Sequence, residues 1–209
     1  MRASGILMPI FSLPSKYGIG TLGREAYRFI DFLEKAGQTY WQMLPAGPTG
    51  FGDSPYQSFS VFAGNPYFID LDMLAEEGFL TKAEIEAVDW GKSTDRVDYG
   101  NLYEKRFPLL RLAAERFRGT RSIEYDVFCR FHARWLKDYA LFMAIKDSLS
   151  GCSVDCWEEG LKLRRESSVS AARERLSESV EFYQILQFWF HRQWKKLRSY
   201  AAGKGIKLI

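Results

Sequence analysis

YWQMLPAGPTGFGDSPYQSFSVFAGNPYFIDL, residues 40–71, joins a short apolar segment to a long loop rich in glycine, proline and aromatic residues. The first part, Tyr40–Leu44, has the composition of a buried strand. The glycines at positions 47, 50 and 52 suit tight turns and a close approach of the backbone. The stretch therefore predicts a strand that delivers a structured loop.

Asp53, Ser54 and Tyr56 lie at the centre of this loop, with Pro55 between them. A carboxylate and a hydroxyl can hold sugar hydroxyls, and the face of a tyrosine ring can lie against the C–H surface of a pyranose. Functional groups often sit on loops that a rigid scaffold positions. The alternative from spacing alone is a rigid structural turn with aromatic packing.

Residues on the N-terminal side extend the fold prediction. Gly5–Ile10 is a short apolar run typical of a buried strand. Arg24–Gly37 carries apolar residues at helical spacing, and Gly37 marks its end. Strand, helix and strand within about 40 residues are typical of a βαβ unit in a parallel sheet.

The chain after the loop is expected to be mostly helical. Thr81 and Glu84 have the spacing of a capping box, and Asp70 and Asp72 are expected to be turn or helix-start residues. A last strand is expected at Ile206–Ile209. Helices are predicted from apolar periodicity at Leu102–Phe117, Tyr125–Leu149 and Val180–Ala202.

Composition indicates a globular protein with a substantial core. The chain is 46% hydrophobic, 26% charged and 16% aromatic, with a net charge of +3, so neither disorder nor a nucleic-acid partner is favoured. No apolar run of about 18 residues and no signal pattern is present, so no membrane partner is expected. Cys129, Cys152 and Cys156 are odd in number, which favours reduced thiols and a cytoplasmic location. Too few ligands are grouped for a metal site, and no cofactor is expected.

Several long motifs, in one order, resemble a known family. They are MPIFSLPSKYGIGTLG (8–23), the opening stretch (40–71), RVDYGNLY (96–103), WLKDYALFMAIKD (135–147) and FWFHRQWKKLRSYAAGKGIKLI (188–209). With these motifs the chain resembles the 4-α-glucanotransferases, the amylomaltases or disproportionating enzymes of glycoside hydrolase family 77.

The resemblance implies an α/β fold, namely the N-terminal part of a (β/α)8 TIM barrel with a large, mainly helical insertion after the second strand. A complete barrel needs eight strands, and this chain has three candidates, so the barrel is incomplete here. The implied domains are 1–64 for the first two βα units, 65–178 for the insertion, and 179–209 for a barrel helix and the start of the third strand.

The implied activity is the transfer of α-1,4-glucan segments to the 4-hydroxyl of an acceptor glucan or glucose by a retaining double displacement. The family uses an Asp nucleophile, a Glu acid/base and a second Asp, all from later barrel strands. No catalytic residue is therefore expected in this chain, which is predicted to be inactive alone. The implied partners are α-1,4-glucans (maltooligosaccharides, maltodextrin and starch) and glucose. The alternative is a non-catalytic glucan-binding or structural fragment.

The resemblance also implies which residues line the substrate cleft. Tyr56 is expected to stack on a glucose unit, with Asp53, Ser54 and Gly52 on the same wall, and Pro14 and Tyr17 are expected to shape the rim. Tyr103 matches a tyrosine that supports a second glucan site in some members. Phe51 stands where its stacking partner is a tyrosine, so the ring face is kept and the hydroxyl is lost.

Overall fold

The computed structural model describes residues 2–50, 52–91, 93, 95–120 and 122–209. The chain divides into two compact units. One consists of Met1–Thr120 with Trp189–Ile209, and the other of Arg121–Phe188. The expected division into 1–64, 65–178 and 179–209 stays a prediction.

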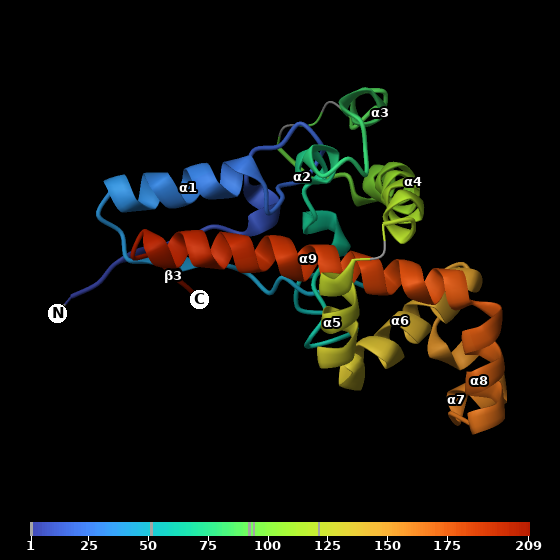
Figure 1. Ribbon diagram of the computed structural model, residues 1–209. Coiled ribbons are helices and arrows are strands. Elements are labelled where there is room, and N and C mark those ends of the chain that lie inside the picture. The colour runs from blue at the N-terminus through green and yellow to red at the C-terminus, as the bar shows by residue number, and fades with distance from the viewer. Residues whose placement is uncertain (1, 51, 92, 94, 121) are drawn as a thin grey trace. The chain divides into compact units, whose positions relative to one another are not determined.

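The first unit is built on a small parallel sheet near the two ends of the chain (Figure 1). The strand order is β1-β2-β3, with Ile6 and Leu208 on either side of Trp41. Trp41 is fully buried, and its indole N–H donates to the Met8 carbonyl at 2.7 Å. The strands are β1 Gly5–Leu7, β2 Tyr40–Gln42 and β3 Lys207–Leu208.

All three strands are shorter than expected, although their positions are as predicted. Pro9 begins a short 3-10 turn, η1 (Ile10–Ser12), which ends the first extended segment. Leu7 in β1 and Ile209, which directly follows β3, are exposed, and each outer strand has one hydrogen-bonded neighbour in the described sheet. The expectation of buried strands holds best for the central position, Trp41.

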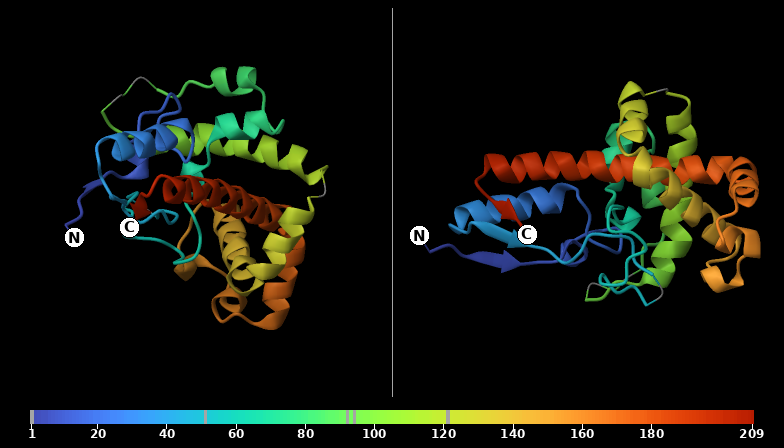
Figure 2. Two further views of the ribbon diagram at one scale, coloured as in Figure 1. Left: turned by 60° about the vertical axis from the view of Figure 1, so that its left-hand side comes forward. Right: turned by 90° about the horizontal axis from the view of Figure 1, so that it is seen from below.

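Helix α1 (Arg24–Lys35) is the crossover between β1 and β2, so the predicted βαβ unit is confirmed. Gly37 adopts a φ of +66°, the left-handed conformation that favours glycine after a helix. The C-terminal part of α9 (Ser177–Gly203) runs beside α1 before the chain enters β3 (Figure 2). There the Tyr200 hydroxyl donates to an Asp31 carboxylate oxygen at 2.5 Å.

The remaining helices of this unit confirm the local capping signals. Thr81 and Glu84 form the predicted capping box, and Asp70 caps the start of α2 by accepting from the Met73 N–H at 3.0 Å. Phe79 and Phe117 pack against Trp189 in the core. The elements are η2 Pro66–Phe68, α2 Leu71–Glu76, α3 Lys82–Glu86 and α4 Tyr99–Arg118.

The second unit is helical, with one departure from the expected elements. The single helix expected over Tyr125–Leu149 is wrong, because the chain breaks at His132, whose φ and ψ are −95° and 7°. The Nδ1 atom of His132 accepts from the indole N–H of Trp135 at 3.1 Å, and neither glycine nor proline marks the break. The elements of the unit before α9 are α5 Ile123–Phe131, α6 Ala133–Ser148, η3 Val154–Cys156, α7 Glu159–Lys162 and α8 Glu166–Arg175.

The expectation of reduced thiols also needs correction. Cys152 and Cys156 are joined as a disulfide, and Cys129 is free. The turn between α6 and α7 brings the two Cα atoms to 6.2 Å, which lies in the range that a disulfide spans. Counting cysteines could not anticipate this, because the pairing depends on how this turn folds.

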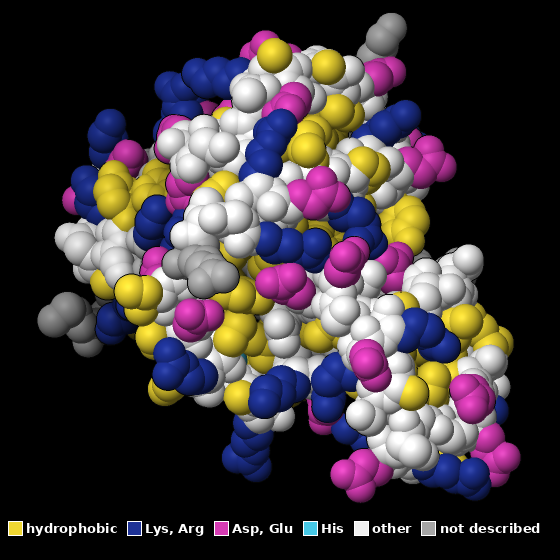
Figure 3. Space-filling model, turned by 45° about the vertical axis from the view of Figure 1, so that its right-hand side comes forward, with side chains coloured by type: hydrophobic (Ala, Val, Ile, Leu, Met, Phe, Trp, Pro, Cys, Tyr) yellow, Lys and Arg dark blue, Asp and Glu magenta, His cyan; other side chains and the backbone are white. Residues whose placement is uncertain are grey.

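The described part of the chain has no helix that is both long and apolar enough to cross a membrane. Basic and acidic side chains are interspersed over the face shown in Figure 3, with apolar side chains between them. Neither basic nor acidic side chains gather into a large patch on that face.

Candidate functional site

The loop after β2 folds back on itself as a short hairpin. Thr49 and Ser58 form an isolated antiparallel bridge, and the Gly50 N–H donates to the Gln57 carbonyl at 3.1 Å. At the tip, Gly52 has a φ of +85°, a conformation that glycine adopts readily. The predicted structured loop is present. The expected stacking position at Phe51 lies outside the described residues.

Asp53 is held at the tip of this hairpin. Its φ of +54° is left-handed, which aspartate tolerates better than most residues, and its N–H donates to the Gly50 carbonyl at 3.1 Å. The carboxylate is half-buried and accepts from the Thr49 hydroxyl at 3.4 Å. Burial raises the pKa of Asp53, and the Thr49 hydroxyl partly opposes that rise. The result is a partly desolvated acceptor beside an open surface.

Ser54 and Tyr56 complete the same turn. The Ser54 hydroxyl oxygen accepts from the Tyr56 N–H at 3.3 Å, and the Ser54 carbonyl accepts from the Gln57 N–H at 3.1 Å. These bonds hold the turn, while the Tyr56 side chain remains 73% exposed. An exposed aromatic ring on an ordered turn is suited to stacking on a ligand, because the backbone that carries the ring does not have to be ordered on binding.

The first loop lies between β1 and α1, and its two predicted residues occupy different environments. Pro14 is exposed, whereas Tyr17 is only 5% exposed and lies behind the rim. The Tyr17 hydroxyl donates to the Asp72 carboxylate at 2.5 Å, and the ring meets Trp90 edge-on at 5.6 Å. Burial and the neighbouring Asp72 carboxylate both raise the pKa of Tyr17.

A cavity of about 580 Å³ opens beside this first loop. It combines hydroxyl groups, an acid, an arginine and aromatic rings, a set that suits a polyhydroxylated ligand. Neither Asp53 nor Tyr56 contributes to its wall. Its lining residues are Phe11, Ser12, Leu13, Pro14, Ser15, Gly18, Ile19, Ser93, Asp95, Arg96, Val97 and Tyr99.

Tyr103, the expected member of a second glucan site, lies on α4 and is exposed. Its ring centroid is 5.6 Å from that of Phe107, which in turn lies 5.8 Å from Tyr67. The Tyr103 ring therefore packs against Phe107 and is otherwise open to solvent. Its predicted pairing with position 51 stays a prediction.

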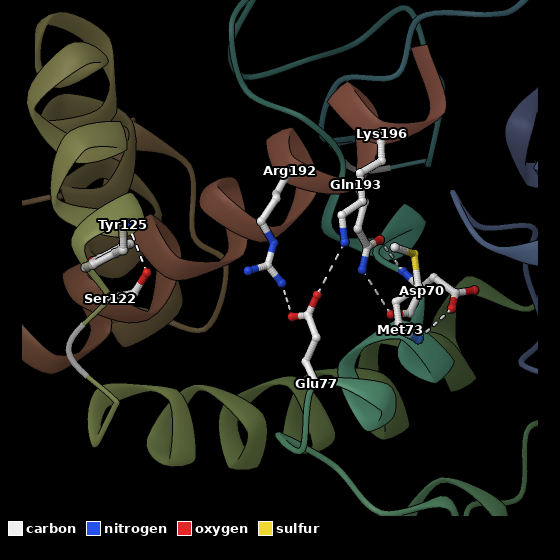
Figure 4. A network of polar contacts seen from close by, with 8 residues as sticks. All are labelled: Asp70, Met73, Glu77, Ser122, Tyr125, Arg192, Gln193 and Lys196. Carbon is white, nitrogen blue, oxygen red and sulfur yellow. Dashed lines mark hydrogen bonds and ion pairs between the residues drawn. The ribbon is translucent and has the colours of Figure 1, made fainter. Parts of the chain in front are cut away.

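Buried polar groups anchor the end of the candidate loop. Asp70 accepts from the Thr21 hydroxyl at 2.5 Å, which ties the segment after the loop to the segment before α1. The side-chain amide of Gln193 bonds the backbone of Asp70 twice, at 2.7 and 3.2 Å. Figure 4 shows this contact, with Arg192 and Lys196 reaching the Glu77 carboxylate on the same side of α9.

Arg106 is a second anchor, and sequence reasoning missed it. The side chain is fully buried on α4 and donates from Nη2 to the Ile69 carbonyl. It also lies 6.0 Å from the Trp90 ring, and burial lowers its pKa to about 10. The available signal was the position of Arg106 between Leu102 and Leu109 on the apolar face of a predicted helix.

No group of histidine, cysteine, aspartate and glutamate side chains within the described ranges is arranged to hold a metal ion. The groups described at the site are hydroxyls, carboxylates and aromatic rings. Such groups bind ligands by hydrogen bonding and stacking.

The chain is similar to known proteins over nearly all of its length. It matches the profile of the 4-alpha-glucanotransferases over residues 8–209. It is 46% identical to the 4-alpha-glucanotransferase of Clostridium butyricum over 202 residues, which covers 97% of this chain and 42% of that protein. It is 47% identical to the Thermus thermophilus 4-alpha-glucanotransferase over 212 residues, with 100% of this chain and 41% of that protein covered. The chain thus spans about two fifths of the length of these curated relatives.

Solved structures support the same relationship. An amylomaltase from Streptococcus agalactiae in complex with acarbose superimposes with a TM-score of 0.95 at 42% identity, covering 100% of this chain and 42% of that one. The amylomaltase from Corynebacterium glutamicum gives a TM-score of 0.73 at 19% identity, covering 98% of this chain and 29% of that one, and shows likeness of fold alone. The match over 8–209 and these sequence relatives together show that the chain belongs to the 4-alpha-glucanotransferase family.

Proposed function

We propose that this chain forms part of the substrate cleft of a 4-α-glucanotransferase. Tyr56 stacks on a glucose unit, while Asp53, Ser54 and the backbone at Gly52 bond sugar hydroxyls from the same wall. The supporting observation is the exposed Tyr56 ring beside the half-buried Asp53 carboxylate, on a hairpin that follows a parallel strand. Loops at the C-terminal ends of strands build the site in barrel enzymes.

The first loop has a supporting part in this proposal. Pro14 forms the rim of the cavity, and Tyr17 holds the loop from inside through its bond to Asp72. The three parallel strands are proposed to be the opening strands of a (β/α)8 barrel, with a mainly helical insertion between the second and third. The remote site at Tyr103 is proposed as an accessory glucan contact.

The proposed reaction is a retaining transfer of an α-1,4-glucan segment to the 4-hydroxyl of glucose or of another glucan. Retention requires a nucleophile and an acid/base carboxyl about 5–5.5 Å apart. Asp70 and Asp72 do not form such a pair, because Asp70 is buried as a helix cap and Asp72 accepts from Tyr17. The 209 residues alone are therefore expected to bind glucan without transferring it. We propose the cytoplasm as the location.

Binding and turnover can be separated in one experiment. The purified 209-residue chain is titrated with maltoheptaose, with cellohexaose as the control for the β-1,4 linkage, and is then incubated with maltotriose to detect glucose and longer products. Binding of maltoheptaose but not cellohexaose, with no transfer above a blank, is expected. Equal binding of both sugars would contradict the cleft proposal, and transfer by this chain would contradict the assignment of the catalytic carboxylates elsewhere.

A further inference from the structure

The turn between α6 and α7 carries two cysteines that have no part in the proposed glucan binding. Cys152 and Cys156 are four residues apart, and their Cα atoms lie 6.2 Å apart. Ser150 and Gly151 have φ values of +52° and +80°, so the chain reverses directly before Cys152. Ser153 then caps the short helix η3 by accepting from the Asp155 N–H at 3.3 Å. The backbone thus brings the two thiols together.

The same turn is bound by two lysine side chains. Lys146 donates from Nζ to the carbonyl of Gly151 at 2.5 Å and to that of Cys152 at 3.4 Å. Lys162 donates to the carbonyl of Asp155 at 3.0 Å. The Asp155 carboxylate accepts from the Ser153 hydroxyl at 2.9 Å, so the acid on the turn is itself hydrogen-bonded. Hydrogen bonds of the Lys146, Lys162 and Ser153 side chains thus fix the backbone of the turn that carries both cysteines.

The three cysteines differ in their access to solvent. Cys156 is exposed and Cys152 is half-buried. Cys129 is half-buried on α5, and burial raises the pKa of its thiol, which disfavours its thiolate. A reagent from solution therefore reaches Cys156 first. Cys152 is the neighbouring thiol that can then displace the reagent from Cys156.

The residue after Cys156 links the pair to the helical core of the unit. Trp157 is 8% exposed, and its ring centroid lies 5.3 Å from that of Phe142 on α6. Its indole N–H donates to the Cys152 carbonyl at 3.4 Å. Forming or breaking the Cys152–Cys156 bond therefore affects a turn that contacts the packed helices through Trp157 and the Cys152 carbonyl.

We propose that Cys152 and Cys156 form a reversible thiol–disulfide pair, a modification site that responds to small disulfides of the glutathione class. The Cys156 thiolate attacks one sulfur of the oxidised reagent, which forms a mixed disulfide and releases one reagent thiolate. The Cys152 thiolate then attacks the Cys156 sulfur, which closes the protein disulfide and releases the second reagent thiolate. Two electrons pass from the cysteine pair to the reagent, and the two cysteine protons pass to solvent or to the released thiolates.

A redox titration tests this site. The 209-residue chain is equilibrated in buffers with increasing ratios of oxidised to reduced glutathione, trapped with N-ethylmaleimide and analysed by intact mass and peptide mapping. A single transition is expected, in which the alkylated cysteines fall from three to Cys129 alone. Alkylation of Cys152 and Cys156 at every ratio would overturn the proposal, and so would a disulfide that contains Cys129.

Three single variants separate the steps. Cys129→Ser is expected to leave the transition unchanged, because Cys129 takes no part. Cys152→Ser is expected to stop at the mixed disulfide on Cys156, and Cys156→Ser is expected to remove the transition. Loss of the transition in Cys129→Ser, or its retention in Cys156→Ser, would overturn the proposal. The titration of the unmodified chain stands without any variant, so a variant that fails to fold leaves the test intact.

Discussion

Replacing Tyr56 by alanine is the sharpest test of the proposed cleft. A tyrosine side chain buries about 150–250 Å² when enclosed, so covering one face of its ring removes on the order of 80 Å² from water. At about 25 cal/mol per Å², this contact contributes about 2 kcal/mol. Because about 1.4 kcal/mol corresponds to a tenfold change in affinity, Tyr56→Ala is expected to raise the Kd for maltoheptaose about 30-fold.

The same substitution should leave the fold almost unchanged. Tyr56 is 73% exposed, so the free energy of unfolding should change by less than about 0.5 kcal/mol. Isothermal titration calorimetry measures the Kd, and urea unfolding measures stability. Tyr56→Phe is the matched control, because it keeps the ring face and should retain most of the affinity. If Tyr56→Ala binds normally, or unfolds the protein while the folded fraction binds normally, the loop is a structural turn and the stacking argument fails.

Three other perturbations test the packing around the site and the second unit. Thr21→Val should lower the free energy of unfolding by about 1–3 kcal/mol in urea titrations, because the buried Asp70 carboxylate loses the hydroxyl that donates to its Oδ2 atom and keeps only the Met73 N–H on Oδ1. Thr21→Ser should restore most of the loss, and equal stability of both variants would contradict this. Hydrogen bonds from Arg116 and from Thr81 in the capping box lower the pKa of Glu84 from 4.5 to about 2. These bonds therefore stabilise the folded protein fully above pH 4.5, and this stabilisation is lost as the pH falls toward 2. Urea unfolding across that range should show a smaller pH dependence in Glu84→Gln, and an unchanged pH profile would refute the assignment. Reducing the disulfide of the α6–α7 turn should lower the Tm by about 5 °C, since cross-linking a five-residue loop stabilises the folded protein by about 2 kcal/mol. A Tm that is the same in both redox states would contradict this stabilisation.

Signals that act between near neighbours in the chain were predicted correctly. The capping box at Thr81 and the helix stop at Gly37 are both present, and Asp70 starts a helix as expected. Each depends on hydrogen bonds or backbone angles within about four residues, so the sequence contains all that is needed. The order of strand, helix and strand was also predictable, because a parallel pair requires a crossover connection.

The candidate site was predictable in part. The grouping of Asp53, Ser54 and Tyr56 on one loop follows from their closeness in sequence, and the structure adds that the Tyr56 ring is exposed and the Asp53 carboxylate is half-buried. The burial of Tyr17 was not predictable, because it depends on Asp72 and Trp90, which lie far along the chain.

Three features could not be predicted from periodicity, composition or cysteine count. The break at His132 carries no glycine or proline, so helical periodicity continues through it. The disulfide depends on a local reversal at Ser150, where a residue other than glycine has a positive φ. Arg106 is buried at a position where composition predicts an exposed charge, because the Ile69 carbonyl and the Trp90 ring meet it from other segments. The sequence by itself determined the local elements and the family, whereas long-range contacts decided which polar groups are buried, since burial depends on segments that are distant in the chain.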